Sequence, residues 1–175
     1  MLSLERAAGV CPVKRPFLEA LAVWGRRLDD AGIRGSLAYR FALGFVISAH
    51  GSDLRKLAEG DLLFLEPREP SSNSWTVKGA GEPSVAWWTL ATAFADRGSA
   101  IFAFLAEEEK WARAARAGAP RVSRAAEGVS AAAIVEIEAG LGRGNAVALD
   151  GIGAMALGST ADDAGLELLR LLGKG

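Results

Sequence analysis

The stretch Ser36-Leu37-Ala38-Tyr39-Arg40-Phe41, followed closely by Phe45-Val46-Ile47-Ser48, decides the fold of this chain. Both segments are short and contain aromatic and β-branched residues, and Leu43-Gly44 separates them, which is the pattern of a β-hairpin. The second segment runs into the sequence Ala49-His50-Gly51-Ser52. We therefore expect two antiparallel strands, with a turn containing His50 directly after the second one.

The residues before this hairpin predict an amphipathic helix. Pro16 is tolerated in the first turn of a helix, and Gly32 can take the left-handed conformation that ends one. Between these two residues, apolar side chains recur at helical spacing, at Phe17, Leu21, Trp24 and Leu28. We expect residues 1–14, ahead of the helix, to form a loose N-terminal segment.

Downstream of the hairpin, short strands alternate with helices. The expected strands are 62–65, 75–77, 100–105, 145–149 and 154–157, with 75–77 at a sheet edge and 100–105 at the centre. The expected helical segments are 53–58, a helix capped by Ser84, 107–117, 130–141, and a last helix between Thr160 and Gly173. Because hairpins and crossover helices are mixed, the order predicts an α/β domain with a mixed, largely antiparallel sheet covered by helices.

Length, charge and cysteine content limit the class of protein. The 175 residues suit one domain, 1–175, and 20 Lys and Arg against 21 Asp and Glu give no overall attraction to nucleic acid. No apolar run approaches the roughly 20 residues of a membrane helix, and Met1–Arg6 lacks the pattern of a secretory signal. The single cysteine, Cys11, is expected to be a reduced thiol. We therefore expect a cytoplasmic protein that binds neither nucleic acid nor a membrane.

Three patterns that resemble functional motifs are explained better by structure. Gly151-x-Gly153-x-x-Ala156 has the spacing of a dinucleotide-binding turn, but Gly158-Ser159 interrupts the helix that should follow. The serines lack a Gly-x-Ser-x-Gly elbow, and only one histidine is present as a base. Glu107-Glu108-Glu109 are consecutive and, on a helix, cannot converge on one metal ion. The sequence therefore predicts no catalytic residues, no metal site and no cofactor.

His50, the only histidine, has a functional and a structural interpretation. In the functional one, its turn precedes a short helix whose amide groups meet an anion or a carbonyl, and Arg40 and Lys56 add positive charge to the same pocket. In the structural one, the histidine is satisfied by local backbone hydrogen bonds. Both interpretations remain open at the level of the sequence.

Five short segments, taken in order, carry a family resemblance. Gly35–Arg40 reads approximately as Gly-Asn-Ile-Ser-x-Arg, Gly44–Gly51 as a stretch ending Ile-Thr-Pro-Ser-Gly, and Lys56–Leu63 as Leu-Thr-x-x-Asp-Leu-Val. Glu82-Pro83-Ser84 is similar to Pro-Ser-Ser-Glu, and Asn145–Ala164 to a strand-turn-strand-helix unit. Together these segments span nearly the whole chain and resemble the class II aldolase/adducin head domain family. The resemblance implies a three-layer α/β/α class II aldolase-like domain.

The resemblance also implies a zinc chemistry that this sequence lacks. Aldolases and epimerases of the family bind zinc through three histidines, use a nearby glutamate as acid and base, and hold a sugar phosphate in the first two loops. The histidine positions fall at or near Ala103, Leu105 and Ile152, and the glutamate position at or near Ala86. The ligand contacts that the resemblance leaves in place are Gly35, Ser36, His50, Gly51 and Ser84.

These observations predict a non-catalytic class II aldolase-like domain that acts as a cytoplasmic binding or scaffold protein. The alternative is a metal-independent enzyme, or a binder of a small anionic carbohydrate or carboxylate, that uses the His50 loop. Its ligand-binding residues would be Gly35, Ser36, Arg40, His50, Gly51 and Ser84. We also predict a homo-oligomer, since family members commonly form cyclic tetramers and Trp87-Trp88 face different sides of one helix. One of the two tryptophans would then enter a groove or a subunit contact, unless both pack in the core.

Overall fold

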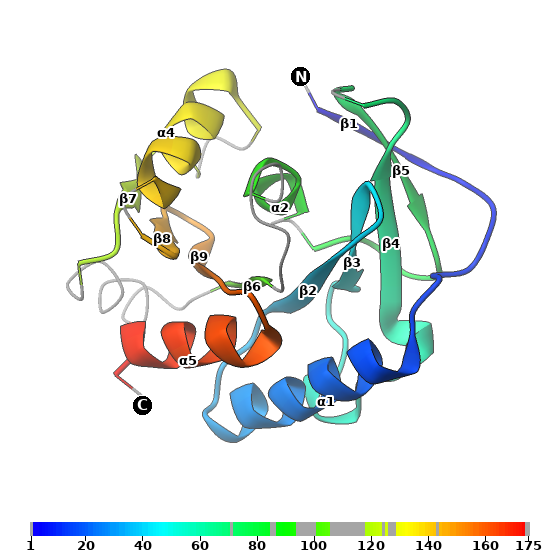
Figure 1. The fold of residues 1–175 in the computed structure, drawn as a ribbon, viewed down its shortest axis with the longest axis horizontal. Coiled ribbons are helices and arrows are strands. Elements are labelled where there is room, and N and C mark those ends of the chain that lie inside the picture. The colour runs from blue at the N-terminus through cyan, green and yellow to red at the C-terminus, as the bar shows by residue number, and fades with distance from the viewer. Residues whose placement is uncertain are drawn as a thin grey trace.

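In this computed structural model, the hairpin of β2 (Ser36–Phe41) and β3 (Gly44–Ser48) lies inside a single sheet of nine described strands (Figure 1). The structure describes residues 2–70, 72–84, 87–93, 101–105, 118–123, 125, 129–142 and 144–173, with the backbone alone at 93 and 101–105. The strands are β1 (Ser3–Arg6), β2 (Ser36–Phe41), β3 (Gly44–Ser48), β4 (Leu62–Pro67), β5 (Ser74–Lys78), β6 (Ile101–Leu105), β7 (Arg121–Val122), β8 (Ala146–Leu149) and β9 (Gly153–Leu157). The helices are α1 (Arg15–Asp30), α2 (Trp87–Ala93), α4 (Ala131–Leu141) and α5 (Ala161–Leu171), with 3-10 turns at Leu54–Lys56 and Glu59–Asp61.

The strand order is β1-β5-β4-β3-β2-β6-β9-β8-β7, and the sheet is mixed. The β1–β5 and β7–β8 pairs are parallel, and the other neighbouring pairs are antiparallel. The predicted α/β domain with a largely antiparallel sheet is therefore confirmed. The strand predicted at 100–105 lies in the interior of the sheet, between β2 and β9.

The hairpin follows the sequence pattern closely. Phe41 pairs with Gly44, so Ala42 and Leu43 form a two-residue loop. Ala42 has φ 51°, a left-handed conformation that non-glycine residues seldom adopt. Gly44 has no side chain to clash at the start of β3, where a Cβ would lie 1.9 Å from the carbonyl oxygen of Leu65 on β4. Glycine at that position allows β3 and β4 to pair.

Helix α1 begins and ends as the sequence predicts. Pro16 occupies its first turn, and the helix buries Leu21, Trp24 and Leu28 against the sheet. At its end, Gly32 takes φ 68°, and its amide donates to the carbonyl of Asp29. The amide of Ile33 donates to the carbonyl of Leu28 at 2.8 Å. This pair of hydrogen bonds is the Schellman motif, for which a left-handed glycine is preferred.

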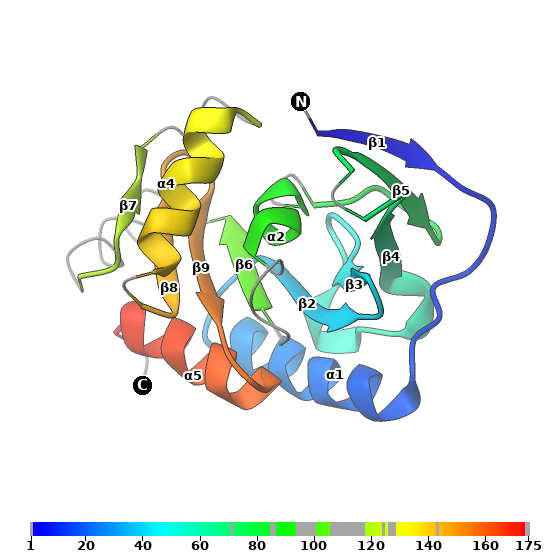
Figure 2. The same ribbon diagram turned by 45° about the horizontal axis from the view of Figure 1, so that its top comes forward.

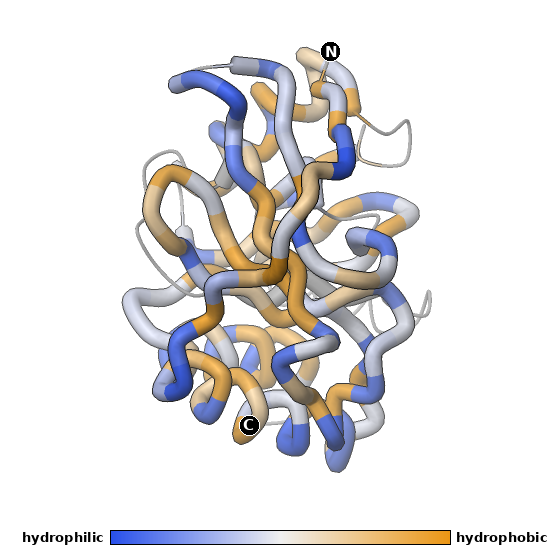
Figure 3. The backbone as a smooth tube through the Cα atoms, turned by 90° about the vertical axis from the view of Figure 1, so that its right-hand side faces the viewer, coloured by the Kyte–Doolittle hydropathy of each residue, from blue (hydrophilic) through white to orange (hydrophobic). Residues whose placement is uncertain are grey.

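Helices cover both faces of the sheet, which confirms the three-layer α/β/α arrangement. Helices α1 and α5 lie side by side on one face, and α2 and α4 on the other (Figure 2). Each pair packs on its own group of buried side chains. Figure 3 shows hydrophobic residues concentrated along the central strands and hydrophilic ones towards the periphery. In the described part of the chain, no helix has the length and apolar character needed to cross a membrane.

The prediction of a loose segment at 1–14 is wrong for Ser3–Arg6. These residues form β1, which pairs in parallel with β5 from Ser74 to Val77. Strand β5 therefore does not lie at the edge of the sheet, so the prediction of an edge strand at 75–77 is wrong. Trp75 on this strand is buried. The short strand β7 lies at the other edge of the sheet, and the sequence pattern does not predict it. The predicted helix 107–117 and residues 94–95 of the helix after Ser84 lie outside the described residues.

The glycines at 151 and 153 belong to a hairpin. Leu149 pairs with Gly153, so residues 150–152 form the loop between the antiparallel strands β8 and β9. Gly151 and Gly153 have φ 71° and 143°, which glycine adopts without strain. The interpretation of these glycines as a turn rather than a dinucleotide-binding loop is confirmed.

Candidate functional site at one end of the sheet

Residues from two neighbouring strands of the predicted ligand-binding set meet where β2 begins and β3 ends. The antiparallel register of the two strands pairs Ala38 with Ile47, so that Gly35, just before β2, and His50, just after β3, lie at the same end of the hairpin. Ser36, the first residue of β2, is 5% exposed, while His50 and Gly51 are exposed. This end of the sheet therefore combines a buried hydroxyl group with an accessible imidazole ring.

A third segment, Glu82-Pro83-Ser84, closes the same end. Pro83 forms a β-bridge with Ala49, and the amide of His50 donates to the carbonyl of Glu82 at 2.7 Å. Ser84 is 2% exposed, and its carbonyl accepts a hydrogen bond from the amide of Trp87 at the start of α2. Five of the six predicted residues, Gly35, Ser36, His50, Gly51 and Ser84, are thus gathered at this end.

Hydrogen bonds of the turn restrict what it can bind. The amide of His50 is used by Glu82, and the amide of Ser52 donates to the carbonyl of Ala49 at 3.2 Å. The functional interpretation required the amide groups of the short helix after the turn, and two of these are also used: the Arg55 amide donates to the Asp53 carboxylate and the Lys56 amide to the Asp53 carbonyl, both at 3.0 Å. The imidazole of His50 is exposed and forms no hydrogen bond within the described part of the chain, so neither interpretation of this histidine is confirmed.

Charge near the turn is balanced by Arg6 of β1. The guanidinium group of Arg6 lies 3.2 Å from the carboxylate of Glu82 and donates to the backbone carbonyls of Gly79 and Gly81. The N-terminal strand therefore fixes the loop that bonds to His50. The Glu82 carboxylate remains largely exposed, and its negative charge repels an anionic ligand that approaches the turn.

Arg40 does not belong to this end of the sheet, and the prediction that it adds charge beside His50 is wrong. It pairs with Phe45 near the other end of the hairpin, four residues and about 13 Å along the strand from Ser36. Arg40 instead lines a separate cavity of about 270 Å³ between α1 and the start of α5. Because a strand has a large rise per residue, four residues are enough to separate Arg40 from the end of the sheet that holds Ser36 and His50.

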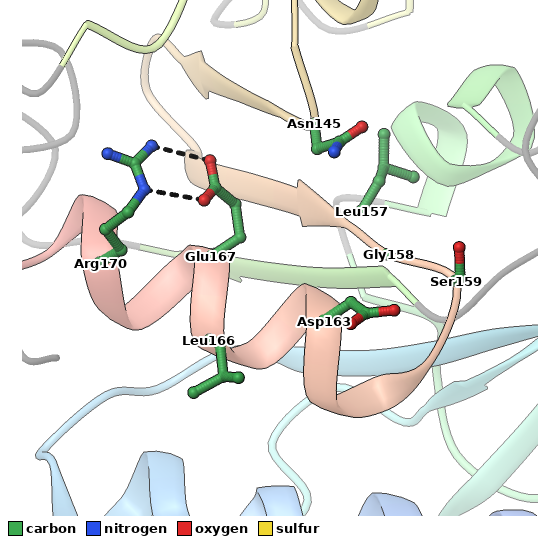
Figure 4. Close-up of a pocket in the computed structure, with 8 residues that line it drawn as sticks. All are labelled: Asn145, Leu157, Gly158, Ser159, Asp163, Leu166, Glu167 and Arg170. Atoms are coloured by element: carbon green, nitrogen blue, oxygen red, sulfur yellow. Dashed lines mark hydrogen bonds and ion pairs between the residues drawn. The ribbon is translucent and has the colours of Figure 1, made fainter.

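A larger cavity of about 680 Å³ lies beside α5 (Figure 4). Its charged side chains pair within the protein: both nitrogens of the Arg170 guanidinium that face Glu167 donate to its carboxylate at 2.8 Å. This hydrogen bonding lowers the pKa of Glu167 and raises the pKa of Arg170. Asp163 forms a capping box with Thr160. None of the predicted site residues lines this cavity. The charged side chains of its wall, Asp163, Glu167 and Arg170, form hydrogen bonds with other residues of helix α5 and its N-cap.

The described residues do not fit the zinc ion that the resemblance implies. Leu105 pairs with Gly153, the residue after Ile152, and Ala103 stands on the same strand beside Ser36. The fold thus brings the three expected ligand positions to the same end of the sheet, but their side chains carry no nitrogen, oxygen or sulfur donor. Ile152 is 9% exposed and packs in an apolar cluster. No group of three or more metal-ligating side chains occurs in the described ranges, and Ala86, at the expected glutamate position, lies outside them.

The two other chemically reactive side chains of the interior are unsuited to catalysis. Burial raises the pKa of the Cys11 thiol to about 11, and burial raises the pKa of Tyr39 to about 12. Both groups therefore stay protonated at neutral pH, and a buried neutral thiol is a poor nucleophile. The backbone of Lys14 approaches the Tyr39 hydroxyl, but no hydrogen bond of acceptable geometry satisfies that buried group within the described chain.

Trp87 and Trp88 both pack within the monomer. Trp88 is 3% exposed, and the partly buried Trp87 lies 6.3 Å from Trp75, measured between ring centroids. Both belong to the apolar cluster beneath α2 and α4. Both tryptophans therefore contribute to the core, and the subunit contact at this pair stays a prediction.

Solved structures share this arrangement of strands and helices. The L-fuculose-1-phosphate aldolase from Thermus thermophilus matches with a TM-score of 0.67 and 19% identity, over 92% of this chain and 89% of that chain. This chain has the class II aldolase fold. A sugar-phosphate aldolase from Thermotoga maritima gives a TM-score of 0.63 at 13% identity, over 91% and 92% of the two chains. The N-terminal class II aldolase domain of a conserved protein from Thermoplasma acidophilum gives 0.65 at 10% identity, over 95% of each.

No protein-family model and no curated protein matches the sequence. The likeness to solved structures therefore concerns the fold. What the class II aldolase fold does in this chain depends on the residues at the end of the sheet described above.

Proposed function

We propose that this protein is a class II aldolase-like domain that does not catalyse the zinc-dependent reaction and serves as a binding or scaffold domain. One observation carries the proposal. The three positions at which the resemblance places zinc ligands fall at or near Ala103, Leu105 and Ile152, at the end of the sheet where β6 meets the β8–β9 turn.

The chemistry of the fold's zinc enzymes explains why these residues matter. A metal ion in such a reaction acts as a Lewis acid that polarises a carbonyl group and stabilises the negative charge of an enediolate. Removing one preorganised stabiliser of developing charge costs about two to three orders of magnitude in rate. Three apolar residues in place of three ligands remove the ion itself. The buried hydroxyls of Ser36 and Ser84 supply no comparable positive charge.

A zinc titration and an activity assay on the full chain test the proposal together. Protein dialysed against a chelator is titrated with zinc chloride by calorimetry, and L-fuculose 1-phosphate is then incubated with the zinc-supplemented protein. We expect no saturable zinc binding and no loss of the sugar phosphate above the protein-free rate. One zinc bound per chain, or zinc-dependent cleavage, would contradict the proposal.

A scaffold domain of this kind is proposed to work as a cytoplasmic homo-oligomer, such as a tetramer. The support for this assembly is the family resemblance, since members of the family commonly form cyclic tetramers. The single cysteine is buried and protonated, which suits a reducing compartment. Sedimentation equilibrium tests the assembly, and a monomer mass across a wide concentration range would contradict it.

The alternative function is binding of a small anionic carbohydrate or carboxylate at the His50 end. It is supported by the convergence of Ser36, His50 and Ser84 from three separate segments. Sugar phosphates and short-chain carboxylates are titrated into the wild-type protein and His50→Ala. The alternative requires saturable binding in the wild type and weaker binding in the variant, which lacks the imidazole ring. Absence of saturable binding in both proteins would leave the scaffold function.

A further inference from the structure

Strand β1 lies at the edge of the sheet and is held by a single neighbouring strand (Figure 1). It pairs in parallel with β5, and just beyond it the Ala7 amide donates to the Val77 carbonyl at 2.9 Å. Three of its four residues are exposed, and Leu4 is its one partly buried side chain. Parts of a protein with few buried apolar contacts open locally at a low cost in free energy. Strand β1 is therefore a segment that can open before the rest of the domain.

The chain that follows β1 has the features of a hinge. Residues 8–10 are exposed and belong to no helix or strand, and Gly9 has φ 130°, a conformation that residues with a side chain rarely adopt. The next residue, Cys11, is only 5% exposed and packs in the apolar cluster of α1 and α5. Hinges are short stretches whose backbone angles absorb a movement. Strand β1 can therefore leave β5 by rotation about residues 8–10, while the chain from Cys11 onward keeps its place.

Two exposed ion pairs hold β1 against segments far along the chain. The Glu5 carboxylate pairs with the guanidinium group of Arg68, just after β4. The guanidinium group of Arg6 lies 3.2 Å from the Glu82 carboxylate. All four side chains are at least 45% exposed, and salt weakens the attraction between such exposed charges. The strength with which β1 is held therefore depends on ionic strength.

The contacts of β1 reach the His50 end of the sheet through Arg6. Besides its ion pair with Glu82, Arg6 donates to the backbone carbonyls of Gly79 and Gly81. The carbonyl of Glu82 in turn accepts a hydrogen bond from the amide of His50 at 2.7 Å. The segment 79–82 therefore contacts β1 on one side and the His50 turn on the other.

We propose that β1 is a reversible strap, which opens and closes as a unit and thereby sets the order of the segment 79–82 and of the His50 turn. In the closed state, Arg6 holds this segment and the Glu82 carbonyl covers the His50 amide. In the open state, Arg6 leaves with the strand, the segment loses these contacts, and the His50 amide becomes accessible to water. The strap requires neither zinc nor a ligand, so it does not rest on the function proposed above.

Hydrogen exchange of single amides, followed by NMR on the full chain, tests the strap. Leu4→Ser removes the apolar contact of β1 and leaves Arg6 and residues 79–82 unchanged. We expect exchange to become about tenfold faster at the Ala7 amide, and by the same factor at the His50 amide. The Ile33 amide, bonded at the end of α1, is expected to keep its wild-type rate.

Leu43→Ser is the matched control, because the same substitution is made at a leucine that is 68% exposed. It is expected to leave all three exchange rates unchanged. An unchanged rate at Ala7 or at His50 in Leu4→Ser would overturn the proposal. An equal increase at Ile33 would also overturn it, because β1 would then open only when the whole domain unfolds.

Arg68→Gln tests the coupling from a second direction. It removes the ion pair with Glu5 and leaves the contacts of Arg6 in place. We expect the His50 amide to exchange about twofold faster than in the wild type at about 20 mM NaCl. The difference should disappear at about 500 mM NaCl, where salt screens the ion pair in the wild type. Arg15→Gln, which removes an exposed ion pair within α1, is the control and should leave the His50 amide unchanged. Equal exchange of the His50 amide in Arg68→Gln and the wild type at low salt would overturn the proposal.

Discussion

The indole ring of Trp24 packs directly on the backbone of Gly165, so that a Cβ atom on Gly165 would lie 2.3 Å from the ring. The same indole donates a hydrogen bond from Nε1 to Oδ1 of Asp162 at 2.6 Å. Trp24 is 1% exposed, and these two contacts join α1 to α5 across one face of the sheet. The helix pair that shapes the Arg40 cavity therefore depends on a glycine within α5.

Gly165→Ala is expected to destabilise the protein by about 2 kcal/mol. Alanine improves helix propensity by up to about 1 kcal/mol, but forcing a methyl group into a packed ring costs about 3 kcal/mol. Urea unfolding followed by tryptophan fluorescence measures the difference. Gly60→Ala is the matched control, because a Cβ at Gly60 meets no atom within 4 Å. An equal midpoint for Gly165→Ala and the wild type would contradict the packing described here.

Local signals in the sequence predict helices α1 and α5 and the two hairpins correctly. Pro16 and Gly32 bracket α1, and Thr160 with Asp163 forms the capping box that begins α5. These features depend on residues close in sequence, so the pattern alone reveals them. Strand β1 depends on pairing with residues near 75, far along the chain. The alternation of Leu2 and Leu4 with Ser3 and Glu5 is too short to predict a strand by itself.

Part of the candidate site could be predicted from the sequence, because that part also depends on residues that are close along the chain. The hairpin brings the start of β2 and the end of β3 to the same end of the sheet, and that relation follows from the two strands alone. Arg40 was misplaced because motif order along the chain says nothing about distance along a strand. The cavity that contains Arg40 requires the packing of α1 on α5, which joins residues such as Trp24 and Asp162 from opposite parts of the chain.

Ala42→Gly is expected to stabilise the protein by about 0.5–1 kcal/mol. A left-handed conformation costs an L-residue about 1–2 kcal/mol, and relief of this cost exceeds the extra entropy that glycine loses on folding, about 0.5–1 kcal/mol. Thermal unfolding by circular dichroism measures the change. Ala58→Gly, at an exposed residue with φ −126°, is the control and is expected to shift stability in the opposite direction.

Arg6→Gln is expected to loosen the segment that meets His50. Loss of the guanidinium group removes its contacts with the carbonyls of Gly79 and Gly81 and with the Glu82 carboxylate. Hydrogen exchange should then become faster at the His50 amide, which is bonded to the Glu82 carbonyl, by roughly fivefold for about 1 kcal/mol of local stability. Arg15→Gln removes only an exposed ion pair with Glu19 within α1, and should leave this amide unchanged.

Stability is expected to fall at alkaline pH because of Cys11 and Tyr39. Burial raises the pKa of Cys11 from 9.0 to about 11 and that of Tyr39 from 10.0 to about 12, so the folded state favours the protonated groups. Their contribution is complete below pH 9.0 and is lost as the pH rises through about 12, since the unfolded chain releases these protons first.

Tyr39→Phe separates the two contributions. It removes a buried hydroxyl group that has no hydrogen-bond partner in the described chain, and keeps a ring that can stack on Phe17. At pH 7 we expect the variant to be more stable by about 1 kcal/mol, because the cost of an unsatisfied buried polar group disappears. Above pH 10 its stability should decline less steeply than that of the wild type, and the remaining decline is that of Cys11. Urea unfolding between pH 7 and 11 measures both effects. A variant less stable than the wild type at pH 7, with the same alkaline decline, would show that the hydroxyl group is hydrogen-bonded and that its proton is not linked to folding.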